Sequence, residues 1–311
     1  MTSSFGSETS ESRRVATLLL AGTQRLNESG SPSARLDAEL LLAFVLGTDR
    51  AGVLAHPELT LSPDRAEKYG ESVRRRALGE PVAYIRGIKE FFGRVFMVDS
   101  RGLIPRPETE LLVELAVARV RDQLIAAPRP AGTPPLLIAD VGTGSGAIAV
   151  SVALECRRRG YGADVRLIAS DADEAALGLA RENGVGHAVA DLVEFTVADL
   201  LPPADRRFDL LLANLPYVPT DEVPKLPVAA SFEPRAALDG GPDGLTVIGR
   251  LLDQLPDRLA EGGQALLEIG SDQAERLIEL AATKLPGWSV AIHPDLGGLP
   301  RVAELAPSRL P

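Results

Sequence analysis

Cysteine is nearly absent from this sequence: Cys156 is the only one among 311 residues. A single cysteine excludes an internal disulfide, and this usage favours a reducing compartment, so we expect a cytoplasmic location. Cys156 lies in an Ala/Val/Leu-rich stretch where nothing nearby would lower its pKa, which favours a core role over a nucleophilic one. The Ser/Thr/Glu-rich start has no charged segment followed by an apolar one, so no signal peptide is expected.

Long apolar runs and aromatic residues are also scarce. Apolar stretches such as Leu136–Ala139 are far too short to cross a bilayer, so we expect no membrane association. Aromatic residues make up 4% of the chain and hydrophobic residues 45%, which predicts a core built mainly from Leu, Val, Ile and Ala. The length allows one large domain or two unequal ones.

An excess of basic residues is missing too, since the net charge is −10. The first 110 residues carry equal numbers of basic and acidic side chains, so the whole acidic excess lies in the remainder. A duplex-binding protein usually has a basic face, and this balance argues against a nucleic acid as the direct substrate. No His/Cys/Asp cluster has metal-ligand spacing, and none of the three histidines (His56, His187 and His293) is placed to act as a base.

The chain divides into four predicted parts. Residues 1–12 are small and polar and are expected to form a disordered tail. Residues 13–80 repeat apolar positions at helical spacing and are interrupted by Gly and Pro, which predicts a small helical domain. Residues 81–104 contain β-branched and aromatic runs separated by Gly, with one strand over 80–87 and the next over 89–98, and are expected to form a β-hairpin linker. The remaining part, 105–311, forms the main domain.

In the main domain, after a helix over 111–120, strands alternate with helices. Strands are expected over 136–141, 165–170, 193–198, 208–213, 263–270, 288–293 and 301–305, and helices over 147–159, 174–183, 245–259 and 273–284. Repeated βα units predict an α/β fold with a mostly parallel, doubly wound sheet. Ligands of such sheets bind at the carboxyl ends of the strands, so residues that follow the strands are the candidates for chemistry.

A glycine-rich loop, Asp140–Gly146, joins the first of these strands to its helix. Its glycines permit close backbone approach, and the helix N-terminus offers free N–H groups to a polar ligand. The spacing of Gly142, Gly144 and Ala147 also fits a dinucleotide fingerprint, so a nicotinamide oxidoreductase has to be considered. Asp140 argues against that alternative, because a carboxylate there would repel a pyrophosphate and suits a cationic group, such as the amino group of S-adenosylmethionine.

Polar residues also follow the next strands. Asp171 ends the second strand, where a carboxylate can accept hydrogen bonds from both ribose hydroxyls; the alternative is a helix N-cap. Asp199 follows the third strand and can accept a hydrogen bond from an adenine amino group, or simply begin a loop. The fourth strand ends in Asn214–Tyr217, with the sequence Asn-Leu-Pro-Tyr. An amide, a kinked backbone and an aromatic ring there can grip a planar polar group, although Asn and Pro are also ordinary turn residues.

With these motifs, the sequence resembles the peptide chain release factor glutamine N5-methyltransferases. The resemblance covers about residues 13–305 and includes, besides the glycine loop, the blocks Leu36–Leu42, Gly79–Ile85, Ile104–Glu110, Phe232–Leu238 and Gly240–Leu245. One departure is Leu215, which occupies the position of the first Pro in the family's usual Asn-Pro-Pro-Tyr. Asn-Leu-Pro-Tyr is the form seen in ribosomal RNA adenine dimethyltransferases, which lack the other blocks.

The resemblance implies a class I methyltransferase fold with a helical substrate-docking domain, S-adenosylmethionine as the cofactor and a release factor as the partner. It implies acceptor binding by Asn214, Leu215, Pro216 and Tyr217, with the Asn214 amide and the Leu215 carbonyl accepting hydrogen bonds from the acceptor nitrogen and Tyr217 stacking on its planar group. Cofactor-binding residues would be Asp140, Gly142, Thr143, Gly144, Gly146, Asp171, Asp199 and Asn214, with Arg106 and Thr109 from the Ile104–Glu110 block. No metal is implied.

Other functions remain open at this point. A relative that acts on a small planar metabolite would keep the same cofactor half, and an adenine N6-methyltransferase would share the tetrapeptide. A binding module that holds the cofactor without turnover, and the nicotinamide oxidoreductase, are the remaining alternatives.

Overall fold

The computed structural model describes residues 10–126, 132–202 and 206–308. It divides the chain into two compact units, one made of the chain up to Ile88 together with Leu226–Phe232, and the other of Lys89–Lys225 and the part from Glu233 onward. Of the tail predicted over residues 1–12, residues 1–9 lie outside the described residues, and residues 10–12 form a turn.

The first unit is helical. Its helices are α1 (Val15–Glu28), α2 (Ala34–Leu46), α3 (Arg50–Ala55), α4 (Pro63–Ala77) and α5 (Val82–Arg86). Sequence signals explain the bounds: the Ser62 hydroxyl accepts the Arg65 N–H and Pro63 begins α4, while Gly47 ends α2 in a left-handed conformation. Apolar residues of α1, α2 and α4, among them Leu26, Leu41 and Tyr69, form one buried core.

The segment before the hairpin corrects one prediction. We expected a strand over 80–87, but Val82–Arg86 forms helix α5, which follows Pro81 and is ended by the left-handed Gly87. The hairpin begins one residue before the next predicted run, 89–98, and consists of β1 (Ile88–Phe91) and β2 (Arg94–Met97). Phe92 and Gly93 at its turn both have positive φ, as the tight two-residue hairpin turn requires. The run predicted as one strand therefore contains the turn and nearly all of both strands of the hairpin.

The second unit is built on a seven-stranded sheet. Its strands are β3 (Leu136–Val141), β4 (Val165–Asp171), β5 (Val193–Val197), β6 (Phe208–Ala213), β7 (Leu259–Glu268), β8 (Trp288–Pro294) and β9 (Pro300–Pro307). Their order is β5-β4-β3-β6-β7-β9-β8, with the first five parallel and β9 antiparallel to both neighbours. The predicted doubly wound, mostly parallel α/β fold is confirmed.

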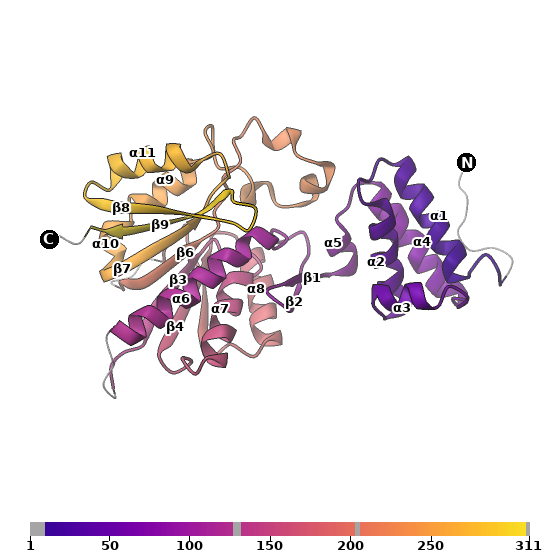
Figure 1. Ribbon diagram of the computed structural model, residues 1–311, viewed down its shortest axis with the longest axis horizontal. Coiled ribbons are helices and arrows are strands. Elements are labelled where there is room, and N and C mark those ends of the chain that lie inside the picture. Colours follow the sequence, from indigo (N-terminus) through magenta and orange to yellow (C-terminus); the bar gives the residue numbers. More distant parts are fainter. Residues whose placement is uncertain (1–9, 127–131, 203–205, 309–311) are drawn as a thin grey trace. The chain divides into compact units, whose positions relative to one another are not determined.

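Helices cover both faces of this sheet. Figure 1 shows α6 (Glu110–Ala126), α7 (Ala147–Arg158) and α8 (Glu174–Gly186) on one face, and α9 (Thr246–Leu252), α10 (Leu255–Arg258) and α11 (Ala274–Lys284) on the other. A buried apolar core lies on each face of the sheet, and successive strand residues point into alternate cores. Ile138 and Leu210 belong to one core, and Ala139 and Leu211 belong to the other. One helix was expected over 245–259, but it is divided, since Pro256 lies at the start of the separate helix α10.

The hairpin is packed into the second unit. Phe91 and Phe96 are buried in the core that contains α6 and α7, with their rings 6.1 Å apart in an edge-on arrangement. The Asn183 side chain on α8 accepts the Met97 N–H (2.8 Å) and donates to the Met97 carbonyl (3.0 Å). These bonds tie β2 to the helix that follows β4.

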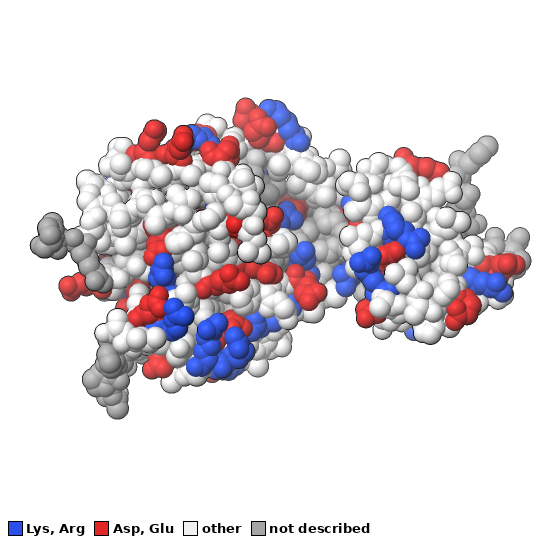
Figure 2. Space-filling model, viewed as in Figure 1, with Lys and Arg blue, Asp and Glu red and all other residues white. Residues whose placement is uncertain are grey.

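The long segment between β6 and α9 contains three short 3-10 turns, η2 (Val223–Lys225), η3 (Val228–Phe232) and η4 (Arg235–Ala237). Of these, η3 belongs to the helical unit, where Val228 packs so closely on Gly79 that a Cβ there would lie 2.5 Å from Val228 Cγ1. Charged side chains of both signs are interspersed on the face seen in Figure 2. Within the described residues, no helix has the length and apolar character needed to cross a bilayer.

Candidate active site

A cavity of about 610 Å³ lies in the second unit at the carboxyl edge of the sheet. The strand register explains its position: β3 pairs with β4 and β6, so the residues that follow Val141, Ser170 and Ala213 meet at this edge. Ten of the predicted site residues line the cavity: Arg106, Thr109, Gly142, Thr143, Gly144, Asp171, Asp199, Asn214, Leu215 and Pro216. The other three, Asp140, Gly146 and Tyr217, are not part of its wall.

The glycine loop allows two close approaches that a Cβ would obstruct. Gly142 has a φ of +70°, and a Cβ there would lie 3.0 Å from Cδ2 of the buried Leu215. Gly146 has a φ of +80°, and a Cβ there would lie 3.1–3.2 Å from Cβ and Cα of Ala180 on α8. The loop thus lies closely between the segment Asn214–Tyr217 and helix α8.

Replacement of Gly146 by Ala is expected to lower the free energy of unfolding by about 2–4 kcal/mol, because left-handed backbone strain and contact with α8 act together. Gly160→Ala is the matched control, since Gly160 also has a positive φ (+86°) but no atom within 4 Å of the place that a Cβ would occupy. The control should lose only about 1–2 kcal/mol, from backbone strain alone. Urea denaturation followed by circular dichroism measures both; equal losses would show that contact with Ala180 contributes nothing.

Asp140 lies beneath the loop and is fully buried. Its Oδ2 accepts hydrogen bonds from the Thr143 hydroxyl (2.6 Å) and the Ala149 N–H (3.1 Å). Burial raises the pKa of Asp140 to about 6, although these two bonds act in the opposite direction. The carboxyl therefore holds the loop to the start of α7, and its contact with a cationic ligand stays a prediction.

Asp171 supports the loop from the neighbouring strand. Its Oδ2 accepts the Gly144 N–H (2.9 Å) and its Oδ1 accepts the Asp173 N–H (2.9 Å). Burial raises the pKa of Asp171, although these backbone bonds favour the charged form. The N-cap of α8 is Asp173, which accepts the Ala175 N–H, so the alternative role considered for Asp171 belongs to its neighbour.

Asp199 lies at the outer part of the cavity wall. Its side chain is exposed and forms an ion pair with Arg250, with 2.5 Å between Oδ2 and the guanidinium nitrogen. Arg106, which also lines the cavity, pairs with the buried Glu233 at the same distance, and Glu233 also accepts the Ile104 N–H (3.0 Å). Glu233 thus joins two of the sequence blocks that carry the family resemblance, but sequence spacing gave no signal that they meet.

Asn214 directly follows β6 and is half-buried. Its Nδ2 donates a hydrogen bond to the Thr109 hydroxyl oxygen (3.1 Å), so the orientation of the amide directs Oδ1 away from Thr109. Thr109 lies in the 3-10 turn η1 (Pro107–Thr109) that precedes α6. The threonine predicted to bind the cofactor therefore also holds the predicted acceptor-binding amide.

Tyr217 is placed differently from the other residues of the tetrapeptide. Its ring packs against the core beneath α9 and α11, and its hydroxyl donates to Oε1 of Glu268 at 3.4 Å. Burial raises the pKa of Tyr217 to about 12, so the phenol stays neutral at physiological pH. Its position matches a ring packed under the loop, and stacking on an acceptor stays a prediction. Glu268, missed in the sequence, ends β7 as Asp171 ends β4.

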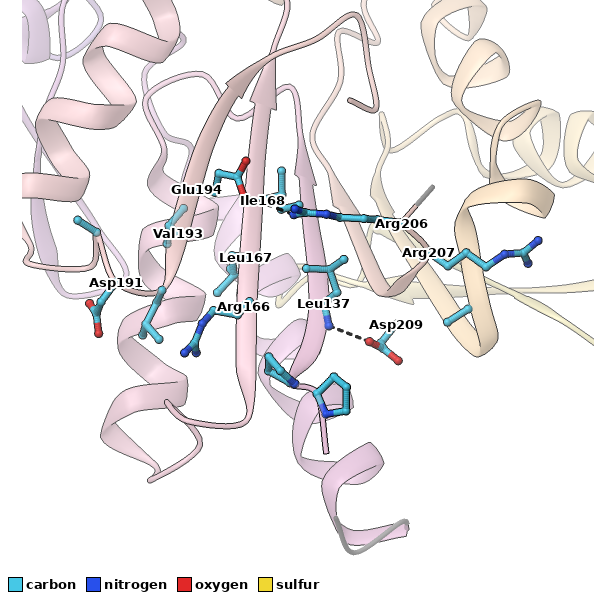
Figure 3. A pocket seen from close by; sticks show the side chains of 15 residues that line it. Leu137, Arg166, Leu167, Ile168, Asp191, Val193, Glu194, Arg206, Arg207 and Asp209 are labelled. Atoms are coloured by element: carbon cyan, nitrogen blue, oxygen red, sulfur yellow. Dashed lines mark hydrogen bonds and ion pairs between the residues drawn. The ribbon is translucent and has the colours of Figure 1, made fainter. Parts of the chain in front are cut away.

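A second cavity, of about 830 Å³, lies at the opposite edge of the sheet (Figure 3). It is bordered by Leu137, Arg166, Ile168 and Arg206 and contains none of the predicted site residues. In Figure 3 the Asp209 carboxylate accepts the Leu137 N–H (2.7 Å). The amino ends of strands provide no glycine loop or helix N-terminus, so the smaller cavity is the better candidate site.

The doubly wound sheet, with its glycine loop and the Asn-Leu-Pro-Tyr segment at one edge, defines a methyltransferase fold. The family model "Methyltransferase small domain" matches residues 134–237. The catalytic domain of human METTL16, solved with hairpin 1 of the MAT2A 3′UTR, shares this fold with a TM-score of 0.51 at 14% identity, over 81% of this chain and 84% of that one.

The helical unit and the relatives that match most of the chain show which family of methyltransferases this chain resembles. The family model "PrmC N-terminal domain" matches residues 17–87. The release factor glutamine methyltransferase of Koribacter versatilis is 40% identical over 90% of this chain and 93% of its own length. That of Moorella thermoacetica is 38% identical over 89% and 93%, respectively. The chain belongs to the release factor glutamine methyltransferase family, and these relatives give no support to the oxidoreductase or adenine methyltransferase alternatives.

Proposed function

We propose that the protein transfers a methyl group from S-adenosylmethionine to the side-chain amide nitrogen of a glutamine in a peptide chain release factor. The observation that carries this proposal is the placement of Asn214: its amide lies at the wall of the cavity that also contains the glycine loop, and Thr109 holds its Nδ2. In the same proposal, the helical unit docks the release factor and the enzyme acts in the cytoplasm.

The residues of the cavity fit the proposed cofactor. Its volume lies within the range typical of small-molecule sites. Asp171 offers a carboxylate to the ribose hydroxyls, and the exposed Asp199 can accept a hydrogen bond from the adenine amino group. Gly142 and Gly144 bring the backbone close without side chains, and Arg106 also lines the cavity. When bound, the cofactor supplies an electrophilic methyl carbon, so neither a metal nor a covalent enzyme intermediate is needed.

The protein's contribution to catalysis is alignment and charge stabilisation. An amide nitrogen is a weak nucleophile because its lone pair is delocalised into the carbonyl. Oδ1 of Asn214 and the carbonyl of Leu215 can accept the two N–H groups of the acceptor, which orients the nitrogen toward the methyl carbon. Transfer of the methyl group would break its bond to the cofactor's sulfonium sulfur and leave a neutral thioether. The positive charge would pass to the acceptor nitrogen, where these two oxygens would stabilise it until one N–H proton leaves to water.

The proposal is tested by incubating the enzyme with a purified release factor and methyl-labelled S-adenosylmethionine. Label on the release factor supports it, and no label under conditions where calorimetry shows cofactor binding would favour a small planar metabolite as the acceptor. Calorimetry with NAD is the companion measurement, since tight NAD binding would contradict the cofactor assignment.

Leu215→Pro is expected to retain turnover to within about tenfold, because the acceptor-binding carbonyl remains and proline stiffens the backbone. The same substitution removes a buried side chain that contacts Gly142, so the free energy of unfolding should fall by about 1–3 kcal/mol. Steady-state kinetics and urea denaturation separate the two effects. A loss of turnover as large as that of Asn214→Ala would show that the leucine side chain itself takes part in binding the acceptor.

A further inference from the structure

Glu268 is the last residue of β7 and lies beside the acceptor tetrapeptide. The register pairs Ala213 of β6 with Leu267 of β7. The residues that come next, Asn214 and Glu268, therefore lie opposite each other at the same edge of the sheet. The Glu268 side chain is almost completely buried, with 1% of the residue exposed. A carboxyl at this place belongs to the same edge of the sheet as the cavity.

The carboxyl of Glu268 has few hydrogen-bond partners among its neighbours. Oε1 accepts a long hydrogen bond from the Tyr217 hydroxyl (3.4 Å), and Oε2 is buried without a hydrogen bond among the described residues. The Thr109 hydroxyl lies near enough to the same carboxyl to lower its pKa, and the same hydroxyl oxygen accepts the Asn214 Nδ2–H at 3.1 Å. Since an unsatisfied buried carboxyl is destabilising, its presence beside a candidate site points to a functional use.

Charged groups from two other elements also face Glu268. Arg301 on β9 favours the charged carboxylate, and Glu108 in the turn before α6 opposes it. Burial has the largest effect, and together these influences raise the pKa of Glu268 to about 7. Tyr217, the remaining titratable neighbour, stays neutral in this range. The ionisation of Glu268 therefore changes near neutral pH.

We propose that Glu268, acting through Thr109, is a positioning residue that fixes the Asn214 amide with its Oδ1 toward the methyl acceptor. The inference rests on the proposed function of Asn214. The Thr109 hydroxyl has one proton; when the oxygen accepts the Asn214 Nδ2–H, that proton is free to be donated to an ionised Glu268. The carboxylate thus selects the amide orientation that offers an acceptor, rather than a donor, to the N–H groups of the substrate.

Protonation of Glu268 reverses the direction of the hydrogen bonds that link Glu268, Thr109 and Asn214. A neutral carboxyl can donate to the Thr109 oxygen, which then directs its own proton toward Asn214 and favours the turned amide with Oδ1 next to Thr109. The Asn214 amide would then present its Nδ2–H groups to the N–H groups of the substrate, and two donors cannot form a hydrogen bond with each other. Because the pKa is raised to about 7, the productive orientation is populated above this pH and lost below it. Turnover should therefore rise with pH up to about 7 and then level off.

The test compares the pH dependence of methyl transfer in the full-length enzyme and in Glu268→Gln. We expect the variant to lose about 10-fold to 100-fold in kcat at pH 8, the range seen when residues that orient the ligands of a catalytic metal are replaced. In the variant, kcat should no longer rise with pH near 7. The dissociation constant for S-adenosylmethionine should stay within about twofold of the wild-type value. Glu261→Gln, an exposed acid on the same strand, is the matched control and should behave as the wild type. Wild-type kcat and pH profile in Glu268→Gln would overturn the inference.

Substitutions of Thr109 provide the second part of the test. Thr109→Val, which lacks the hydroxyl, should reproduce the loss seen in Glu268→Gln, whereas Thr109→Ser should restore most turnover because the hydroxyl returns. The double variant Glu268→Gln/Thr109→Val should be little worse than either single variant, since both act on one amide. Full additivity of the two losses would contradict a shared action through Thr109.

A measurement without turnover separates this inference from the proposed function. The ¹⁵N-labelled side-chain amide of Asn214, assigned by its loss in Asn214→Ala, should shift with a midpoint near pH 7 in the wild type and not in Glu268→Gln. A resonance that does not respond to pH would overturn the positioning role, whatever the methyl acceptor is. Absence of methyl transfer by the wild-type enzyme, together with the expected shift, would contradict only the release-factor assignment.

Discussion

Replacement of Asn214 by Ala is expected to lower kcat by about 10²-fold to 10³-fold, the loss typical when one well-placed group that stabilises transition-state charge is removed. The physical reason is that the Asn214 amide is held by Thr109 at the cavity wall, where its Oδ1 can meet the acceptor nitrogen. Ala cannot accept a hydrogen bond, so the nitrogen loses both its orientation and its charge stabilisation. Single-turnover kinetics with saturating cofactor measures this effect.

The cofactor affinity of Asn214→Ala should stay within about threefold of the wild type, because the glycine loop and Asp171 are untouched. Asn27→Ala, at the exposed end of α1, is the control for a general effect of losing an asparagine side chain. An Asn214→Ala enzyme that turns over normally would remove this residue from the site.

Asp171→Ala should have the second largest effect, this time on cofactor binding. The carboxylate accepts the Gly144 N–H and is predicted to accept the ribose hydroxyls, so the substitution weakens both the loop and the ligand contact. Hydrogen bonds to charged groups contribute about 1.5–3 kcal/mol each, so we expect the S-adenosylmethionine dissociation constant to rise by about 100-fold. Isothermal titration calorimetry measures it directly.

Glu174→Ala is the matched control for Asp171→Ala, since Glu174 is an exposed acid three residues further along, in the first turn of α8. It should bind the cofactor with wild-type affinity. If Asp171→Ala also bound normally, the carboxylate would serve only to hold Gly144, and the ribose contact would have to be assigned elsewhere.

Periodicity made the architecture predictable from the sequence. Alternating apolar strands and amphipathic helices specified the doubly wound sheet, and the residues after its strands indicated where a ligand site would lie. The divided helix before β7 and the helical Val82–Arg86 were missed for local reasons. A short run with Tyr and Ile fits a strand or a buried helical turn equally well, and here flanking Pro81 and Gly87 accompany the helix.

The inner layer of the site was less predictable because it depends on contacts between distant segments. Asp140 follows the pattern of a ligand-binding acid, yet its carboxyl is sealed beneath the loop by Thr143 and Ala149. Tyr217 follows the pattern of a stacking ring, yet it packs into the core. Glu268 is an acid at the end of an apolar strand, and only the strand order places it next to Asn214.

The central claim is that the methyl group is transferred to a glutamine amide nitrogen, and peptide mapping of a methylated release factor tests it most directly. The enzyme, a purified release factor and S-adenosylmethionine labelled at the methyl group are incubated, and the digest is analysed by tandem mass spectrometry. We predict one labelled peptide with the methyl group on a glutamine side chain, absent when Asn214→Ala replaces the wild type over the same short time. Label on another residue type, or an unmodified release factor beside a cofactor-bound enzyme, would contradict the account.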